Sequence, residues 1–387
     1  MKLNAPINLA FAALLLLCAC SSESPADPPL PGPGADAGTD AGTDAEPPPL
    51  PCSAASVDGI KVAPNDIDGA PPYTLGYPPY AIDGCRLAYV AAPLAGETSG
   101  ALYLRDLAAG TEVLLEAADQ KPRRPTMAGE VIAWEATTSE GRVVRVRAGA
   151  ETIAMAGAFH HAGEPRAAED GVAVTGWLTE SDLGDTDIFL LKLGEAEAFA
   201  IAPAPGQQRF PDISETHVAF TDFSEDPDGR FDENATDLAD VVVYDRATMA
   251  VSPRKRGGKQ AFPLLGAAGS IVYLAWGPMH PEPKFSAYDL LVGDLAAAAS
   301  EDLVAAAITT SLPYIRPVAR GSLVEWVEWP VGAEASLWRR PVDLASPAEQ
   351  VPGLDGLKLF GPSASSSITV VAAQAAGGAV GLRGVAR

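Results

Sequence analysis

The feature that most constrains the fold of this chain is an internal repeat with an interval of about 40 to 54 residues. Each unit has a proline and then, six to eight residues later, a short run of β-branched, aromatic and small apolar residues. After a polar gap comes a second such run, which often ends in Asp. Runs of this length and composition, bounded by Gly, Pro, Asp and Ser, are typical of β-strands. The recurring prolines are Pro79, Pro125, Pro165, Pro211, Pro263, Pro317 and Pro362.

Short strands that recur at this interval predict an all-β fold, a β-propeller, because a single blade cannot bury both of its faces and a ring of blades can. Seven prolines predict seven blades, with six as the alternative. From Pro362 to Arg387 there are 26 residues, enough for three strands. We therefore expect residues 60–63 to supply the missing outer strand and close the ring. The Ala-rich stretch 295–307 is the main helix candidate.

Two segments resemble the propeller domain of TolB-like proteins and their WD40-like blades. Residues 211–222 read Pro-Asp-Ile-Ser-Glu-Thr-His-Val-Ala-Phe-Thr-Asp and are followed by Asp240-Val-Val-Val-Tyr-Asp-Arg. Residues 81–89 read Ala-Ile-Asp-Gly-Cys-Arg-Leu-Ala-Tyr. The resemblance covers residues 79–387 as architecture and implies a propeller. TolB itself has six blades, so the seven prolines depart from that family.

The N-terminus has the pattern of a targeting signal. Lys2 precedes an apolar run over residues 9–17, which is too short to span a membrane. The sequence Leu17-Cys18-Ala19-Cys20 resembles the lipobox of bacterial lipoproteins. That resemblance implies a signal peptide over residues 1–19 and a membrane anchor through lipidated Cys20; the alternative is an ordinary secretory signal.

The segment between the signal and the repeats is rich in Pro, Ala and Asp. Residues 20–51 hold almost no large apolar side chains, so burial cannot offset the entropy of ordering them and we expect a disordered linker. Residues 52–387 then form the propeller. Ser21 stands where the sorting rule for lipoproteins retained in the inner membrane has Asp. We therefore expect an outer-membrane location, facing either the periplasm or the exterior.

The four cysteines fall into two groups. Cys18 leaves with the signal and Cys20 carries lipid, which leaves Cys52 and Cys85 as a pair in an oxidising compartment. This predicts a disulfide between them, with two buried free thiols as the alternative.

The chain is strongly acidic. It has 50 acidic and 27 basic residues, a formal net charge of −23. Such a chain is repelled by nucleic acid and by anionic lipid head groups, so no nucleic-acid partner is expected. Cations or basic partners are the ligands that this charge favours; the alternative is that the charge only maintains solubility.

A long acidic insertion interrupts the fourth unit between residues 222 and 240. Calcium prefers six to eight oxygen ligands, and Asp-x-Asp-Gly resembles part of a calcium loop. The full loop pattern is not met, because Pro227 intervenes and no Glu stands at the closing position. The alternative is a solvated acidic loop. No other cofactor is predicted. The candidate ligands are Asp222, Asp226, Asp228 and Asp232.

The sequence contains no catalytic motif that we recognise. It has four scattered histidines, and it lacks a Gly-x-Ser-x-Gly elbow, a phosphate loop and a dinucleotide fingerprint. We therefore predict that the chain is not an enzyme but a lipid-anchored, non-catalytic module that binds another protein of the cell envelope through its loops. The alternatives are a glycan-binding or glycan-cleaving envelope protein and a purely structural lipoprotein.

Overall fold

The computed structural model describes the chain from Cys52 onward, with short gaps. The described ranges are 52–63, 77–95, 98–181, 184–230, 238–255, 258–266, 269–276, 288–308, 316–330, 333–375 and 378–387. They belong to one unit, Pro49–Arg387. The signal peptide, Cys20 and the linker predicted above lie outside these residues.

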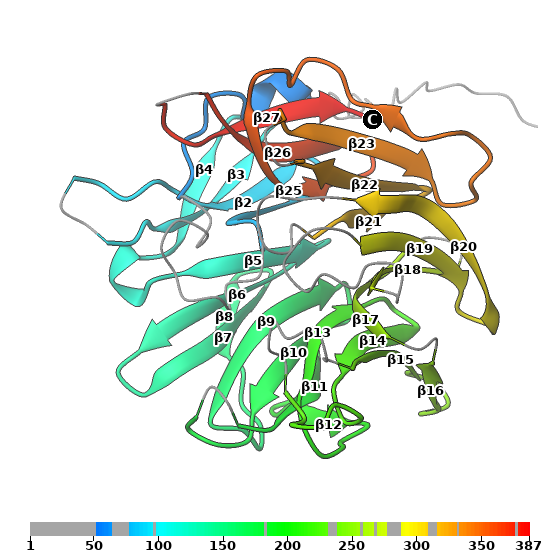
Figure 1. The fold of residues 1–387 in the computed structure, drawn as a ribbon. Coiled ribbons are helices and arrows are strands. Elements are labelled where there is room, and N and C mark those ends of the chain that lie inside the picture. Colours follow the sequence, from blue (N-terminus) through cyan, green and yellow to red (C-terminus); the bar gives the residue numbers. More distant parts are fainter. Residues whose placement is uncertain are drawn as a thin grey trace, which may run out of the picture. The chain divides into compact units, whose positions relative to one another are not determined.

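The described strands form seven antiparallel sheets that follow one another along the chain (Figure 1). Six sheets have four strands and the last has three, and the strands of every sheet pair in chain order. The first strands are β1 (Tyr80–Asp83), β5 (Arg123–Ala128), β9 (His161–Ala168), β13 (Gln208–Ile213), β17 (Lys259–Leu265), β21 (Val318–Arg320) and β25 (Lys358–Ala364). The second strands are β2 (Arg86–Val90), β6 (Val131–Thr138), β10 (Gly171–Trp177), β14 (His217–Asp222), β18 (Ser270–Trp276), β22 (Leu323–Glu328) and β26 (Ile368–Gln374).

The outer half of each sheet completes the blade. The third strands are β3 (Leu102–Asp106), β7 (Gly141–Ala148), β11 (Thr186–Lys192), β15 (Asp240–Asp245), β19 (Tyr288–Asp294), β23 (Ser336–Pro341) and β27 (Gly381–Ala386). The fourth strands are β4 (Glu112–Glu116), β8 (Glu151–Ala154), β12 (Phe199–Ile201), β16 (Val251–Arg254), β20 (Ala297–Ile308) and β24 (Glu349–Gln350). Two short 3-10 helices, η1 (Ala54–Val57) and η2 (Ala118–Gln120), complete the described elements.

The first strands make the ring. Each one contacts the first strand of the next sheet, and β25 contacts β1, so the series closes on itself. The fold is therefore an all-β propeller of seven blades, which confirms the predicted fold class and blade number. The two apolar runs of each repeat unit are the second and third strands of a blade.

The repeat prolines lie in or just before the first strands, and most of these strands contain a bulge there. The pairing register shifts around Arg124, Glu164, Phe210 and Phe262, each of which directly precedes a repeat proline. All four have positive φ angles between 52° and 59°. Proline lacks the N–H that a regular ladder requires, so a bulge is where a first strand can accommodate it.

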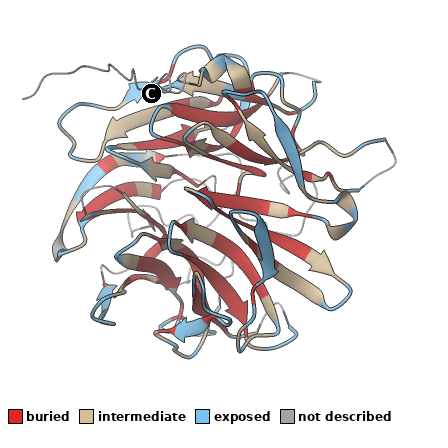
Figure 2. Cartoon of the chain, turned by 180° about the vertical axis from the view of Figure 1, so that it is seen from behind, coloured by how far each residue is buried: buried red, intermediate tan, exposed pale blue. Residues whose placement is uncertain are grey.

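The hydrophobic core lies between the blades. Separate clusters of buried side chains join successive blades; one cluster, for example, contains Val144 of β7 and Val172 of β10. Figure 2 shows buried residues concentrated in the inner strands and exposed residues at the outer edges. Each blade thus gains its apolar burial from its neighbours, as the repeat pattern requires.

The N-terminal segment closes the ring beside β27, as predicted, but not as a regular strand. Lys61 forms an antiparallel bridge with Gly381. Leu382 donates its backbone N–H to Ile60 O at 2.9 Å, and Val62 donates to Val380 O at 3.3 Å. Helix η1 packs against the rest of β27. One bridged residue pair, two backbone hydrogen bonds and one helical turn therefore take the place of a fourth strand.

The predicted disulfide is present. Cys52 is bonded to Cys85 in the turn between β1 and β2, so it joins the closing segment to the first blade. The prediction of a helix over residues 295–307 was wrong. From Ala297 onward these residues belong to β20, which pairs with β19, so strand pairing within the blade overrides the helix propensity of alanine. In the described part of the chain no helix is long and apolar enough to cross a membrane.

Candidate functional site

The first strands enclose a cavity of about 120 Å³ at the centre of the ring. All seven first strands contribute to its lining, together with Tyr77 just before β1 and Arg316 just before β21. The other charged lining residues are Arg124, Arg166, Asp212 and Arg320. This channel cavity is the main place where polar side chains of several blades converge, and it is the candidate site.

Three guanidinium groups surround the ring of Tyr77. The Cζ atoms of Arg316, Arg124 and Arg166 lie 4.7, 4.9 and 5.4 Å from its centroid. Burial raises the pKa of Tyr77 to about 12, although Arg316 opposes that rise. Its hydroxyl has no hydrogen-bond partner among the described residues. Stacking on an aromatic ring favours each cation, but three like charges around one ring also repel one another.

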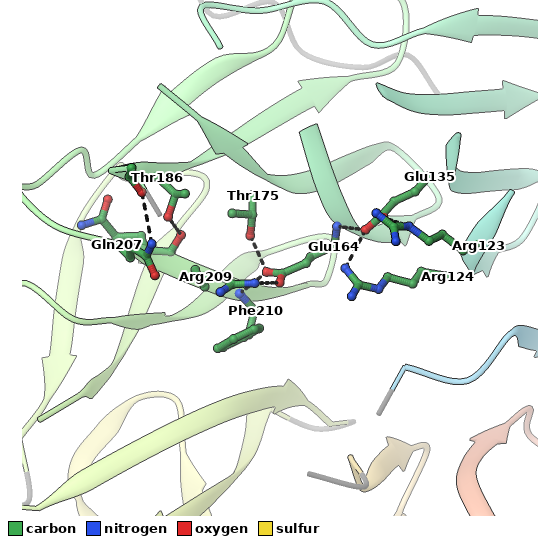
Figure 3. A network of polar contacts seen from close by, with 11 residues as sticks. Arg123, Arg124, Glu135, Glu164, Thr175, Thr186, Gln207, Arg209 and Phe210 are labelled. Atoms are coloured by element: carbon green, nitrogen blue, oxygen red, sulfur yellow. Dashed lines mark hydrogen bonds and ion pairs between the residues drawn. The ribbon is translucent and has the colours of Figure 1, made fainter. Parts of the chain in front are cut away.

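Glu135 of β6 joins the second blade to the third (Figure 3). It accepts hydrogen bonds from Arg123 Nε at 2.7 Å and from Arg124 Nη1 at 2.9 Å, both in its own blade. It also accepts the backbone N–H of Glu164 in β9 at 2.7 Å. Burial raises the pKa of Glu135, but Arg124 and Arg123 outweigh that effect and hold it at about 2. Glu135 is therefore a fully compensated buried carboxylate.

Glu164 repeats this arrangement one blade further on. It is fully buried and forms an ion pair with Arg209 of β13. It also accepts the hydroxyl of Thr175 at 2.8 Å and the backbone N–H of Phe210 at 3.1 Å (Figure 3). Burial raises the pKa of Glu164, and Arg209 and Arg124 together lower it below its ordinary value.

The bulges explain why these carboxylates are where they are. A bulge withdraws a backbone N–H from its own sheet, and a buried N–H needs another acceptor. Glu135 and Glu164 supply that acceptor for the next blade, and Thr221 Oγ1 does the same for the N–H of Phe262 at 3.1 Å. The polar side chains thus bind successive blades together at the rim of the channel cavity.

Arg316 differs from the other channel arginines. It is 2% exposed, and its Nε and both Nη atoms have no hydrogen-bond partner among the described residues. Besides Tyr77, its guanidinium faces the ring of Phe262 at 5.5 Å. Burial lowers the pKa of Arg316 to about 10, with Arg166 adding to the effect and Tyr77 opposing it.

Asp212 and Arg166 form a looser pair in the same cavity. Arg166 Nε lies 3.6 Å from Asp212 Oδ1. Asp212 also accepts the backbone N–H of Leu265 in the next blade at 2.7 Å. Burial raises the pKa of Asp212, although Arg166 opposes this. Asp212 is thus a carboxylate of the cavity lining whose charged form is disfavoured by burial.

The predicted calcium ligands lie away from the channel cavity, at the end of β14 and in the loop after it. Asp222 accepts the backbone N–H of Ser224, Asp226 accepts that of Leu238, and Asp228 accepts that of Arg230. These carboxylates cap local turns. Asp232 lies outside the described residues. Within those residues no three His, Cys, Asp or Glu side chains converge on a metal-sized site, and calcium binding stays a prediction.

Sequence reasoning missed the channel residues. Three of these residues stand directly before a repeat proline: Arg124, Glu164 and Arg316. A charged residue at an otherwise apolar repeat position was the available signal. Their partners Glu135 and Arg209 carried no such signal in the sequence. These two residues reach the bulges of neighbouring blades only because the blades close into a ring.

The comparisons with known proteins concern the fold. No protein-family model matches the sequence, and no curated protein matches it. Among solved structures, the β-propeller domain of the Trilobed protease from Pyrococcus furiosus is 10% identical, with a TM-score of 0.58 over 79% of this chain and 95% of that one. An oligogalacturonate lyase in complex with manganese is 12% identical, with a TM-score of 0.55 over 80% and 89%.

TolB from Acinetobacter baumannii is also among the matched structures. It is 16% identical, with a TM-score of 0.45 over 67% of this chain. The match covers 62% of TolB, so the chain spans less than two thirds of that structure.

These matches correct one prediction. The expectation that the chain is not an enzyme was wrong, because propellers of the same fold belong to a protease and to a lyase. The absence of a familiar motif in a single sequence does not remove catalysis from such a fold, since function resides in sites placed on it. At identities of 10% and 12% the matches show the fold alone. The chain has a β-propeller fold that it shares with a domain of a protease and with a lyase.

Proposed function

We propose that this chain is a lipid-anchored protein of the cell envelope, held to the outer membrane by Cys20, whose propeller binds another protein. The lipobox-like sequence ending at Cys20 supports the anchor, and Ser21 supports the outer-membrane location. The linker of residues 20–51 would hold the propeller away from the membrane surface.

The observation that carries the binding proposal is the character of the outer strands. In each of the first five blades the outermost strand presents a large apolar side chain to solvent, between 37% and 54% exposed. These side chains are Leu114 in β4, Ile153 in β8, Phe199 in β12, Val251 in β16 and Leu303 in β20. An outermost strand also has one edge without a neighbour in its sheet, and a partner protein can pair with such an edge.

The charge of the chain narrows the kind of partner. A net charge of −23 favours a protein with a basic surface and disfavours another acidic one. The partner we propose therefore combines basic residues with apolar side chains that cover the outer strands.

The test is cross-linking in cells of the tagged full-length protein, followed by affinity capture and mass spectrometry of the membrane fraction. We expect one partner to be recovered in a constant ratio to the protein. The triple variant Leu114→Ser, Phe199→Ser, Val251→Ser should lose it. The matched control is Leu94→Ser with Met249→Ser, which changes two exposed apolar residues, 72% and 69% exposed, outside the outer strands.

Loss of the partner in the control, or its retention in the triple variant, would refute the outer strands as the binding surface. The anchor is tested separately by Cys20→Ser. We expect that substitution to move the protein from the membrane fraction to the soluble fraction, with the propeller still folded by circular dichroism. Retention in the membrane fraction would exclude lipid attachment at Cys20.

A second candidate is a glycan-binding or glycan-cleaving envelope protein. The observation that favours it is the channel cavity, because arginine and tyrosine side chains donate hydrogen bonds to sugar hydroxyl and carboxylate groups. Incubation of the purified protein with envelope and external polysaccharides, followed by measurement of new reducing ends, tests cleavage. A glycan array tests binding.

A further inference from the structure

We propose that the channel cavity binds a small monocarboxylate, whose oxygens pair with the guanidinium of Arg316 beside Tyr77. This binding is independent of the partner surface on the outer strands. It rests on the side-chain arrangement inside the ring, and its chemistry is that of a guanidinium fork meeting a planar carboxylate.

The first argument is the isolation of Arg316. Arginine keeps its charge at any ordinary pH and carries five N–H donors. All three nitrogens of this side chain lack a partner among the described residues, although the residue is 2% exposed. Buried polar groups are nearly always hydrogen-bonded, and a buried charge without a partner is costly. An anion in the cavity would supply the missing acceptors.

The second argument is the balance of charge around the cavity. Glu135 pairs with Arg124, Glu164 pairs with Arg209, and Asp212 pairs with Arg166. Arg316 is the buried arginine of this group that forms no ion pair or hydrogen bond among the described residues, and Asp212 and Glu164 act on its charge only from a distance. A monoanion in the cavity would give this arginine a carboxylate partner of its own.

The surrounding carboxylates argue against a more highly charged ligand. Asp212 already bears a pKa raised by burial, and Glu164 is close enough to act on the charge of Arg316. A phosphate dianion would add a second negative charge near both groups. A monocarboxylate would add one, and its two oxygens fit the guanidinium fork.

The third argument is size. The cavity of about 120 Å³ is comparable to cavities that hold one benzene molecule. Acetate or a carboxylate at the end of a short chain fits this volume. The ring of Tyr77 forms one wall and its unpartnered hydroxyl offers a further donor, because a tyrosine with a raised pKa remains protonated at neutral pH.

The experiment uses the full-length protein purified in a non-ionic detergent. Sodium acetate is titrated by calorimetry, and thermal unfolding is followed in acetate, chloride or phosphate at one constant ionic strength. We expect saturable acetate binding and a melting temperature that rises in acetate but not in chloride. Arg316→Met should weaken acetate binding at least about tenfold and remove the rise, since a charge-assisted hydrogen bond is lost.

The matched control is Arg383→Met, which also removes one positive charge. Arg383 is half exposed, and its ion-pair contact with Asp58 is a long one, at 4.0 Å. We expect this variant to bind acetate as the wild type does. If Arg316→Met does not fold, the acetate titrations of Arg316→Gln and of the wild type still show whether Arg316 binds the carboxylate.

A tripeptide with a free C-terminal carboxylate and the same peptide as its amide distinguish two sources of the carboxylate. Tighter binding of the acid peptide than of acetate would identify the end of a chain as the source, and binding of acetate alone would identify a free small acid. No saturable binding of either one, an equal effect of chloride, tighter binding of phosphate, or unchanged binding in Arg316→Met would each overturn the proposal.

Discussion

Two sides of the channel place charged residues at the same position of the repeat and treat them in opposite ways. On the side of blades two to four, Glu164 stands directly before a repeat proline and is bonded to Arg209, Thr175 and the backbone of Phe210. On the side of blade six, Arg316 stands before the equivalent proline and has no hydrogen-bond partner among the described residues. The repeat determines where a charge is buried, and the neighbouring blades determine whether it is compensated.

The physical consequence is a difference in what each charge does for stability. Burial of an ion is costly, and only good geometry with several hydrogen bonds offsets that cost. The Glu135 and Glu164 sites meet this condition and link blades together. Arg316 does not meet it within the described residues, so we expect its charge to destabilise the ligand-free ring. A residue that opposes folding is a better candidate for binding than one that supports it.

The largest effect is expected for Glu164→Ala. This change leaves Arg209 buried without its partner and removes the acceptor of the Phe210 N–H, so we expect the free energy of unfolding to fall by about 3–5 kcal/mol. Urea unfolding followed by tryptophan fluorescence measures it. Glu169→Ala is the control, because Glu169 is exposed in the same blade, and we expect a change within about 0.5 kcal/mol. Equal losses in the two variants would contradict the comparison.

Acidification should remove the stability that the Glu135 carboxylate contributes. Its pKa is about 2 in the folded protein against an ordinary value of 4.5. A depressed pKa contributes stability that is present above the unfolded value and is lost as the pH falls through the folded value. The difference in unfolding free energy between wild type and Glu135→Gln should therefore shrink by about 3 kcal/mol between about pH 5 and pH 2. A constant difference over that range would show that Glu135 is not stabilised as a carboxylate.

The substitution Arg316→Met should change the free energy of unfolding in the opposite direction to Glu164→Ala. A methionine of similar volume removes an uncompensated charge and packs against Tyr77 and Phe262, so we expect the unfolding free energy to rise by about 1–2 kcal/mol in buffer without carboxylate. Arg209→Met, which breaks a pair, should lower it in the same urea titration. A loss of stability in both variants would mean that Arg316 supports the ring, and the contrast between the two sides would fail.

The blades could be predicted from the sequence, but the channel residues could not. Recurrence of prolines such as Pro211 and Pro263 was sufficient for seven units, because a proline that recurs before paired apolar runs marks one position of a repeated blade. The first strands themselves escaped prediction, since proline and a bulge break their alternation. The short, exposed outer strands escaped for a different reason. They have little apolar pattern, and pairing within the blade forms them, as β20 shows.

The ion pairs around the channel could not be predicted because their partners are far apart in the sequence. Glu135 meets the bulge of Glu164, 29 residues away, and Glu164 meets Arg209, 45 residues away. A single sequence does not say which of many charged residues will face one another across a blade interface. It does show that Arg124, Glu164 and Arg316 precede prolines where Phe210 and Phe262 stand in other units. The residue before the repeat proline is charged in three units and is Pro, Phe or Gly in the other four, so these charges were the informative signal.

The smallest effect is expected at Glu325 of β22, which stands between the two extremes. It is 1% exposed and accepts the Thr369 hydroxyl at 2.7 Å, while Arg387 Nε lies 3.5 Å away. Burial raises the pKa of Glu325, and Arg387 only partly opposes it. Glu325→Gln keeps an acceptor for Thr369 and removes a charge, so we expect a change within about 1 kcal/mol near neutral pH.

The pH dependence at Glu325 is opposite in sign to that at Glu135. A raised pKa means that the stability contributed by the protonated group is present below the unfolded value and is lost as the pH rises through the folded value. Relative to Glu325→Gln, the wild type should therefore lose stability as the pH rises from about 4, whereas relative to Glu135→Gln it should gain. Urea unfolding of the three proteins over that range measures both slopes. Slopes of the same sign would show that the two carboxylates share one environment, and that the ring does not divide into compensated and uncompensated sides.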